Sequence, residues 1–316
     1  MNSKSICVLG GTGFVGRHLA ARLANRGHRI TVLTRHPQRH RDIEVLPGAQ
    51  LIEADVHDPT VLQAQFTGCD AVINLVGVLH EYSGQTFAAV HAELPGKVVD
   101  ACHAAGVRRL LHMSALRADA ARGPSQYLFT KGAGEQRVMQ AQELAVTCFK
   151  PSIIFAPNDN FLNQFANLIK RVPVLPLACP NARFAPVYVG DVAAAFEKAL
   201  EDDATIGQCY ELCGPRVYTF KELVEDTARM LGLKRRVVGL PDALARLQAK
   251  ILGVLPVKLF TMDNYLSLQV DSVCACNGLE ALGIAPCSVE GIMAPYFGNQ
   301  RQRQRYDALR QTASRD

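Results

Sequence analysis

The chain has 316 residues, of which 48% are hydrophobic and 20% are charged, so it can bury a large core and is neither disordered nor a coiled coil. No run of about 18 apolar residues lacks a charge or a breaker, which argues against a membrane-spanning helix. The formal net charge is +5, but residues 1–41 carry eight bases and no acid.

Strand-like and helix-like segments alternate through the first half of the chain. The expected strands are 5–9, 29–33, 50–53, 71–75, 109–113 and 146–150, and the expected helices are 14–26, 59–66, 87–105 and 125–144. Pro95 should kink or interrupt the third helix. Such alternation requires right-handed crossovers and a parallel sheet with helices on both faces. The sequence therefore predicts a doubly wound α/β fold of the Rossmann type.

The pattern changes after about residue 150, where prolines cluster and helical stretches follow at 161–170, 192–200, 220–231, 241–252 and 261–268. We expect a dinucleotide-binding domain at 1–155 and a smaller, mostly helical region at 156–300. A segment near 186–200 should return to the first domain, and 301–316 should form a mobile basic tail. The apolar stretch 244–260 fits either a pair of core-covering helices or a surface that meets a membrane or a partner.

A glycine-rich turn joins the first strand to the first helix. It reads Gly10-Gly11-Thr12-Gly13-Phe14-Val15-Gly16. Gly10 allows the tight turn, Gly13 lets the backbone approach a pyrophosphate, and Gly16 lets helix and strand pack closely. The helix N-terminus offers N–H groups and the positive end of its dipole to phosphate. We therefore expect the basic start of the chain to be a βαβ unit that binds a dinucleotide rather than a targeting signal.

The end of the second strand indicates which dinucleotide is bound. NAD sites place an acidic residue there, on the ribose 2′-hydroxyl, but this chain has Thr34-Arg35-His36. A guanidinium suits a 2′-phosphate, so we expect NADP(H) rather than NAD(H), with Arg35 as the main contact. Arg17 is a second candidate, for the pyrophosphate, whereas Arg22, Arg26 and Arg29 are interpreted as solvated.

Tyr127 and Lys131 are four residues apart on a predicted helix and therefore share a face. An ammonium beside a phenol lowers the tyrosine pKa, and such a tyrosine can exchange a proton with a hydroxyl or carbonyl. Ser114 ends the fifth strand, where open α/β sheets place ligand-binding residues. These three residues are the candidate catalytic set.

Taken together, these motifs resemble the short-chain dehydrogenase/reductase superfamily in its extended or atypical branch. The resemblance rests on the glycine loop, Asp55-Val56, Asn74-Leu75-Val76-Gly77, Ser114, Tyr127-x-x-x-Lys131, Lys150-Pro151-Ser152-Ile153 and Pro186–Ala193, which stand in that family's order. Residues 10–19, 91–97, 112–119 and 186–193 are similar to one subgroup, which contains the NADPH-binding accessory subunit 9 of respiratory complex I and its bacterial relatives.

The resemblance implies a role for each matching position. Gly10, Gly13 and Gly16, with Thr12, Phe14 and Val15 between them, would hold the pyrophosphate. Asp55 and Val56 would contact adenine, and Leu75, Val76 and Gly77 the nicotinamide ribose. Tyr127 would be the acid/base, Lys131 would hold the ribose and tune Tyr127, and Ser114 would orient a carbonyl. Pro151, Ser152 and Ile153 would border the nicotinamide amide.

Some positions depart from the superfamily's pattern. His91 stands where typical members carry an active-site Asn, and the second half has only the isolated Arg183 and Arg216 for a sugar-nucleotide diphosphate. Both departures count against an epimerase more than against nucleotide binding.

The resemblance therefore implies an NADPH-binding accessory or assembly protein of respiratory or quinone machinery. The alternatives are an NADP-dependent reductase or a nucleotide-sugar epimerase or dehydratase, and a dinucleotide redox sensor. We expect a cytoplasmic protein, peripheral at the inner face of the membrane, with a dinucleotide and a membrane-associated complex as partners. A metal site and nucleic-acid binding are not expected, and the ten cysteines are interpreted as free thiols in a reducing compartment.

Overall fold

The computed structural model describes residues 3–82, 84–254 and 260–298. The chain divides into two compact units. Unit 1 comprises residues 1–152, 189–213 and 274–285, and unit 2 comprises residues 153–188, 214–273 and 286–316. The predicted tail at 301–316, and Pro256 within the 244–260 stretch, lie outside the described residues.

Unit 1 is built on a seven-stranded parallel sheet in the order β11-β6-β5-β4-β1-β2-β3. The strands are β1 (Ser5–Leu9), β2 (Arg29–Thr34), β3 (Ala49–Glu53), β4 (Ala71–Asn74), β5 (Arg109–Met113), β6 (Ala145–Pro151) and β11 (Cys209–Leu212). The near-continuous burial of the central strands β1, β4 and β5 is typical of a parallel sheet that is covered on both faces. The predicted doubly wound parallel sheet is confirmed.

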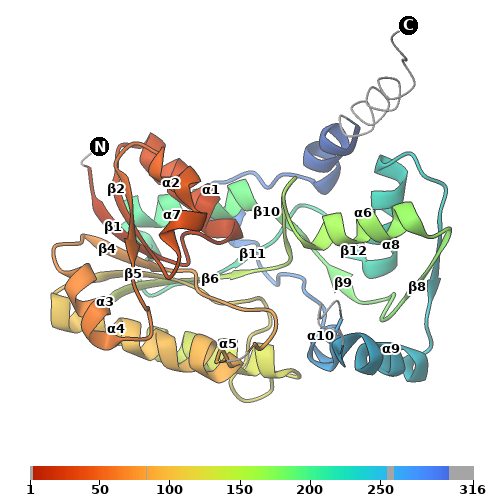
Figure 1. Ribbon diagram of the computed structural model, residues 1–316, viewed down its shortest axis with the longest axis horizontal. Coiled ribbons are helices and arrows are strands. Elements are labelled where there is room, and N and C mark those ends of the chain that lie inside the picture. Colours follow the sequence, from red (N-terminus) through yellow and green to blue (C-terminus); the bar gives the residue numbers. More distant parts are fainter. Residues whose placement is uncertain (1–2, 83, 255–259, 299–316) are drawn as a thin grey trace, which may run out of the picture. The chain divides into compact units, whose positions relative to one another are not determined.

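Helices cover both faces of this sheet (Figure 1). On one face lie α3 (Pro59–Phe66), α4 (Leu94–Ala105) and α5 (Gln126–Met139), and on the other lie α1 (Phe14–Asn25) and α7 (Val189–Glu201). Shorter turns and helices are η1 (Pro37–Arg39), α2 (Arg41–Glu44), η2 (Ala88–Glu93), η3 (Asp203–Thr205) and α11 (Gly278–Ala281). Pro95 lies in the first turn of α4, directly after the π-helical η2, so the predicted interruption is present. The predicted helix 125–144 ends early, at Met139, and Glu143 has a φ of 61°, which a right-handed helix excludes.

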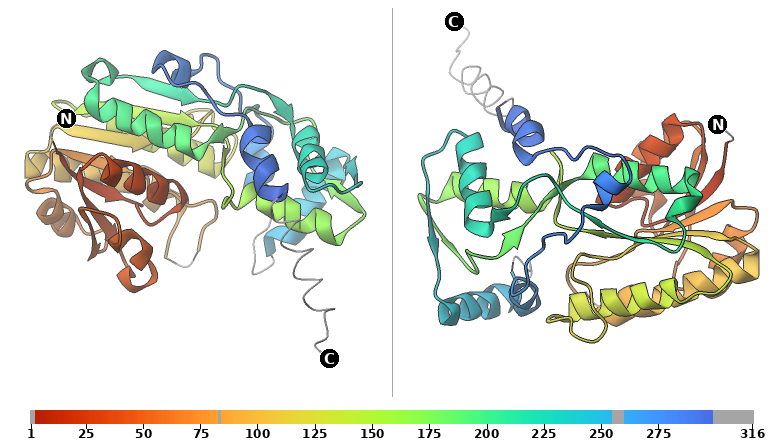
Figure 2. Two further views of the ribbon diagram at one scale, coloured as in Figure 1. Left: turned by 90° about the horizontal axis from the view of Figure 1, so that it is seen from above. Right: turned by 180° about the vertical axis from the view of Figure 1, so that it is seen from behind.

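A buried carboxylate joins α1 to α7, which run side by side in Figures 1 and 2. Glu197 on α7 is 4% exposed and pairs with both Arg22 and Arg26 on α1. The two arginines keep 40% and 46% of their side chains exposed, so they are solvated as expected, but both also pair with an anion that the sequence did not indicate. A buried carboxylate is costly without a partner, so this pair of guanidinium groups explains part of the basic N-terminal segment.

The cysteines also differ from the expectation. Cys213, directly after β11, forms a disulfide with Cys274 across a Cα–Cα distance of 6.0 Å. The bond attaches the segment before α11 to the edge of the sheet, where Asn277 also bonds the backbone of Cys213. The other eight cysteines are free, so the expectation of ten free thiols is wrong for this pair.

Unit 2 contains short strands and an apolar core between helices. Its strand pairs are β7 (Ile154–Phe155) with β10 (Val187–Tyr188), β9 (Arg183–Phe184) with β12 (Tyr218–Thr219), and β8 (Val174–Leu177) with β13 (Arg236–Gly239). Its named helices are α6 (Phe161–Arg171), α8 (Phe220–Met230), α9 (Asp242–Val254) and α10 (Met262–Ser267). Aromatic rings of α6, β9 and α8 pack against one another and fill the core. Phe161 and Phe220 are stacked with centroids 5.9 Å apart, and Phe184 meets Phe220 edge-on.

Candidate functional site

The glycine loop is shaped by close backbone contacts that exclude side chains. Gly10 has a φ of 75°, and a Cβ there would lie 3.0 Å from the carbonyl carbon of Leu75. A Cβ on Gly16 would lie 2.5 Å from Gly11 Cα and closer still to Gly10 O. Only glycine lets α1 approach β1 this closely, which is the packing expected of a dinucleotide loop.

The N-terminus of α1 is open to an anion. Gly13 is its N-cap, is exposed, and has no side chain to satisfy the first-turn N–H groups. The N–H groups of Phe14, Val15 and Gly16 have no acceptor within the helix. Three aligned donors and the helix dipole at an exposed turn form a site that suits a phosphate group.

The two candidate arginines at this end of the sheet have different surroundings. Arg35 follows β2 and is exposed, and its guanidinium faces the Gln85 amide. With that amide turned to accept, its oxygen lies 2.7 Å from Nη1 and 3.1 Å from Nη2. Arg17 instead donates from Nε to Thr12 O at 2.9 Å and pairs with Asp42 at 2.9 Å. Arg17 therefore braces the glycine loop against the segment after β2.

The other predicted cofactor residues follow β3, β4 and β6. Asp55 is exposed, and its Oδ1 accepts from the His57 N–H at 2.9 Å. After β4, Leu75 is buried while Val76 and Gly77 are more open. Because parallel strands end at one edge of a sheet, the residues after β1, β2, β3 and β4 are gathered there.

Pro151 and Ser152 are buried at the end of β6, where the Ser152 N–H donates to Leu212 O at 2.9 Å. Ile153 is the first residue of unit 2, and its carbonyl accepts from the Val187 N–H at 2.9 Å.

Tyr127 and Lys131 on α5 lie beside Gly77 and His91. A Cβ on Gly77 would lie 3.2 Å from Lys131 Nζ and 3.7 Å from His91 Nε2. The Tyr127 ring stands edge-on to the His91 ring, with centroids 5.3 Å apart. The fold thus brings the predicted tyrosine and lysine next to the loop expected to hold the nicotinamide ribose.

Burial governs the charges in this cluster. Lys131 is 4% exposed, and burial lowers its pKa to about 8. Its Nζ donates to Met113 O at 3.0 Å. Burial, followed by the charge of Lys131, lowers the pKa of His91 to about 2, so that ring is neutral at pH 7.

The neutral ring of His91 organises the loop after β4. Its Nε2 accepts from the Val78 N–H at 3.0 Å, so the proton resides on Nδ1, which lies 3.2 Å from Thr130 Oγ1. Histidine in place of the superfamily's asparagine therefore holds the loop that carries Gly77.

The Ser114 hydroxyl, which was predicted to orient a substrate carbonyl, is hydrogen-bonded to a carboxylate. Its hydroxyl donates to Glu135 Oε2 at 2.6 Å, and Glu135 Oε1 pairs with Lys150 Nζ at 2.8 Å. Sequence reasoning missed Glu135, although it lies four residues after Lys131 on the same face of α5. The Ser114 side chain is thus engaged with a carboxylate, while its predicted role toward a carbonyl stays a prediction.

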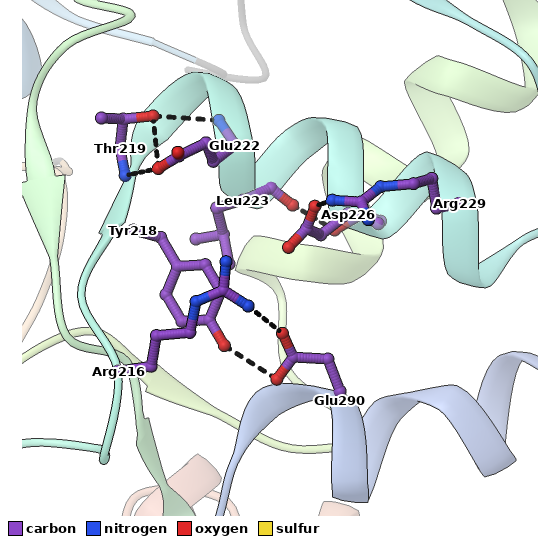
Figure 3. Close-up of polar contacts among 9 residues, drawn as sticks. Arg216, Tyr218, Thr219, Glu222, Leu223, Asp226, Arg229 and Glu290 are labelled. Carbon is purple, nitrogen blue, oxygen red and sulfur yellow. Dashed lines mark hydrogen bonds and ion pairs between the residues drawn. The ribbon is translucent and has the colours of Figure 1, made fainter.

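The isolated arginines of the second half are both paired within unit 2. Arg183 Nη1 lies 3.8 Å from Asp271, and Arg216 Nη1 lies 3.0 Å from Glu290. Figure 3 shows Arg216 stacked over the Tyr218 ring, whose hydroxyl donates to the same Glu290 at 2.8 Å. Each guanidinium therefore already has an anionic partner.

In the described part of the chain, no group of three or more His, Cys, Asp or Glu residues could hold a metal ion. Within the same residues, none of the helices is both long and apolar enough to cross a bilayer.

Comparison with known proteins gives matches along most of the chain. Residues 6–213 match the NAD dependent epimerase/dehydratase family. The chain is 31% identical to the mitochondrial NADH dehydrogenase [ubiquinone] 1 alpha subcomplex subunit 9 of Arabidopsis thaliana, over 93% of this chain and 77% of that protein. It is 33% identical to ceramide reductase of Caulobacter vibrioides, over 75% and 74% of the two chains.

Among solved structures, a dTDP-glucose 4,6-dehydratase of Streptomyces venezuelae with NAD bound matches with a TM-score of 0.74 and 17% identity. The match covers 96% of this chain and 98% of that one, and at this identity it shows the fold alone.

Proposed function

The chain belongs to the NAD dependent epimerase/dehydratase family, and from that premise we propose that it binds NADP(H) and serves as an accessory or assembly protein of a respiratory or quinone-linked complex. The open N-terminus of α1 and the cradle at Gly10 and Gly16 fit a pyrophosphate. Arg35 would hold the 2′-phosphate in place of the Gln85 amide. The proposed cofactor residues are Gly10, Thr12, Gly13, Phe14, Val15, Gly16, Arg35, Asp55, Val56, Leu75, Val76, Gly77, Lys131, Pro151, Ser152 and Ile153.

The outward face of α9 is the observation that carries the accessory role. This helix buries its alanines, Ala245 and Ala249, against Ala178 and Tyr265. Its large side chains point outward: Leu244 is 50% exposed, Leu247 51%, Ile251 57% and Val254 86%. A surface helix normally buries its large apolar residues, and a row of exposed ones marks an interaction surface.

We assign this face to a protein partner in a membrane-associated complex. Two relatives, of Arabidopsis thaliana and Mus musculus, are named as subunit 9 of the mitochondrial NADH dehydrogenase [ubiquinone] 1 alpha subcomplex. Arg246 on the same helix is already paired with Asp242 at 2.9 Å, so little positive charge beyond Lys250 remains to attract anionic lipid. Apolar contact with a protein therefore explains the face better than attachment to a bilayer does.

Replacing Leu247 and Ile251 together by serine is expected to release the protein from its complex. Truncating a buried interface anchor costs at least about 2 kcal/mol, or about 30-fold in affinity. The test expresses the variant in place of the native chain and measures comigration with respiratory complexes on native gels, together with quinone reductase activity of the membranes.

Val45→Ser is the matched control, because Val45 is 81% exposed but lies in unit 1, near α2. Loss of comigration in the α9 variant alone supports the proposal. Unchanged comigration in both variants overturns it, as does binding of the purified native protein to anionic vesicles that the α9 substitutions abolish.

An NADP-dependent reductase is the second candidate, and the position of Tyr127 favours it. The Tyr127 ring lies edge-on to His91, and Lys131, one helical turn later, lies next to Gly77. Burial lowers the pKa of Lys131 to about 8, which is close to physiological pH, as is usual for groups at proton-transfer sites. The paired states of Ser114 and Arg216 count against a sugar-nucleotide epimerase.

If the protein is a reductase, Tyr127→Phe should lower kcat for a carbonyl substrate by about 10²- to 10⁴-fold, the usual contribution of a general acid. The Kd for NADPH should change little, because the ring is retained. The measurement is NADPH oxidation with a panel of lipid and quinone carbonyls. A native protein that keeps NADPH bound and oxidises none of them supports the accessory role instead.

A further inference from the structure

A row of polar side chains crosses the sheet of unit 1 from its interior to its edge. Asn74 on β4 is in register with His112 on β5, His112 with Cys148 on β6, and Cys148 with Cys209 on the edge strand β11. Residues in direct register on parallel strands point to the same face. The first three are buried and Cys209 is exposed, so the row reaches solvent at a thiol.

The two cysteines of this row are close enough to bond. Neighbouring strands lie about 4.8 Å apart, which is within the range of about 4.4–6.8 Å for Cα atoms joined by a disulfide. Hydrogen bonding between the two side chains lowers the pKa of Cys209, whereas the same interaction and burial raise the pKa of Cys148. The exposed sulfur is thus the better nucleophile and the buried one keeps its proton.

Asn74 and His112 form the inner end of the row. Asn74 uses its Oδ1 to accept from the Val76 N–H, so its amide nitrogen donates to His112 Nδ1 at 3.4 Å. The proton of the neutral His112 ring is then on Nε2, and this buried atom has no hydrogen-bond partner among the described residues. The charge that favours a thiolate at Cys148 is that of Lys150, which offsets the effect of burial only in part.

A cavity gives small molecules access to Cys209. Its volume is about 310 Å³, and it lies between β11 and the segment that leads into α11. Cys209 and Cys276 both line it. Cys276 is also exposed but has no place in the row, so it serves as an internal reference thiol.

We propose that Cys209 and Cys148 form an oxidisable dithiol that reacts with hydroperoxides. The Cys209 thiolate attacks the O–O bond, forming a sulfenic acid and releasing an alkoxide or hydroxide that takes up a proton. The Cys148 sulfur, losing its proton, then attacks the sulfenic sulfur, an S–S bond forms, and water leaves. Two thiols and one hydroperoxide give one disulfide, one alcohol or water, and one further water.

The test treats the full-length native protein with equimolar hydrogen peroxide, blocks the remaining thiols by alkylation, and maps the peptides by mass spectrometry. We expect a peptide pair joined through Cys148 and Cys209. In Cys148→Ser, dimedone should instead trap a sulfenic acid on Cys209. Before oxidation, Cys209 should alkylate at least about 10-fold faster than Cys276 at pH 7, because a lower pKa gives more thiolate.

Cys276→Ser is the matched control and should leave the Cys148–Cys209 bond unchanged. Thermal unfolding shows whether the buried serine of Cys148→Ser disturbs folding. If it does, Cys148→Ala replaces that variant, and dimedone should trap the same sulfenic acid on Cys209. A bond between Cys209 and Cys276, or oxidation of Cys209 while Cys148 stays alkylatable, overturns the proposal. So does equal reactivity of Cys209 and Cys276.

Discussion

Replacing Arg35 by serine is expected to raise the Kd for NADPH by about 10- to 100-fold and to leave the Kd for NADH nearly unchanged. A hydrogen bond to a charged group contributes about 1.5–3 kcal/mol, and the guanidinium fork can form two of them with a 2′-phosphate. Arg35 is exposed at the end of β2, and its present partner, Gln85, is an uncharged amide that a phosphate can displace. Titration of the ligand-free protein with each dinucleotide measures both constants.

Arg41→Ser is the matched control for Arg35. Arg41 is also exposed and close in sequence, but its Nη2 donates to Gln38 Oε1 at 2.7 Å. Its loss should change both constants by less than about threefold, since a screened surface charge contributes little. Equal losses for NADPH and NADH in Arg35→Ser would contradict the assignment of the 2′-phosphate. Preference of the native protein for NADH would contradict NADP(H) itself.

The local pattern of the sequence was enough to predict the architecture of unit 1. β1, α3 and β5 have the predicted bounds, because each is a short apolar or amphipathic run closed by a glycine, a proline or a turn. The edge strand β11 was not identified, since four residues with two polar side chains carry little periodic signal. Its place beside β6 depends on contacts far along the chain.

Long-range pairing explains most of what the sequence could not show about side chains. Arg22 and Ser114 were interpreted without Glu197 and Glu135, whose positions depend on how α7 and α5 pack. The bond between Cys213 and Cys274 spans a separation of 61 residues, which spacing alone does not indicate. The glycine loop at residues 10–16 and the Tyr127–Lys131 pair could be predicted, because all residues of each motif lie within one turn or one helix.

Replacing Lys131 by methionine is expected to stabilise the ligand-free protein at pH 7 by about 2 kcal/mol. Burial lowers the Lys131 pKa from 10.5 to about 8, a shift equivalent to about 3 kcal/mol at 1.36 kcal/mol per unit. Methionine removes that cost. It also removes the hydrogen bond to Met113 O, and this loss lowers the stability of the folded protein by about 1 kcal/mol. Denaturant unfolding of both proteins at pH 7 gives the difference.

The pH dependence of this difference has a defined sign. Below pH 8 the lysine is protonated in both the folded and unfolded states, so the full cost of burial is present. Between pH 8 and 10.5 the folded protein releases the proton while the unfolded chain keeps it, so the native protein gains stability as the pH rises. The advantage of Lys131→Met should therefore shrink above pH 8, vanish at about pH 9.5 and be reversed at pH 10.5, where only the lost hydrogen bond remains.

Lys150→Met is the matched control, because the other lysine near Glu135 should respond with the opposite sign. Burial alone would lower the Lys150 pKa, but the hydrogen bond and charge of Glu135 raise it. That pairing stabilises the folded state below pH 10.5 and is lost as the pH rises through the raised pKa, so removing it should destabilise the protein at pH 7. If both variants are less stable than the native protein at pH 7, then burial of the Lys131 ammonium does not destabilise the folded state, and the prediction is wrong.

A stabilising Lys131→Met would itself be evidence that the lysine is kept for binding. Among the described residues, Nζ has a backbone carbonyl as its hydrogen-bond partner, and the charge of Glu135 offsets burial only in part. A protein that retains a buried ammonium under these conditions gains from it when a ligand is present. The same substitution should therefore weaken NADPH binding by about 10-fold or more, the loss of one charge-assisted hydrogen bond to the ribose. Greater stability with unchanged NADPH affinity would exclude Lys131 from the cofactor site.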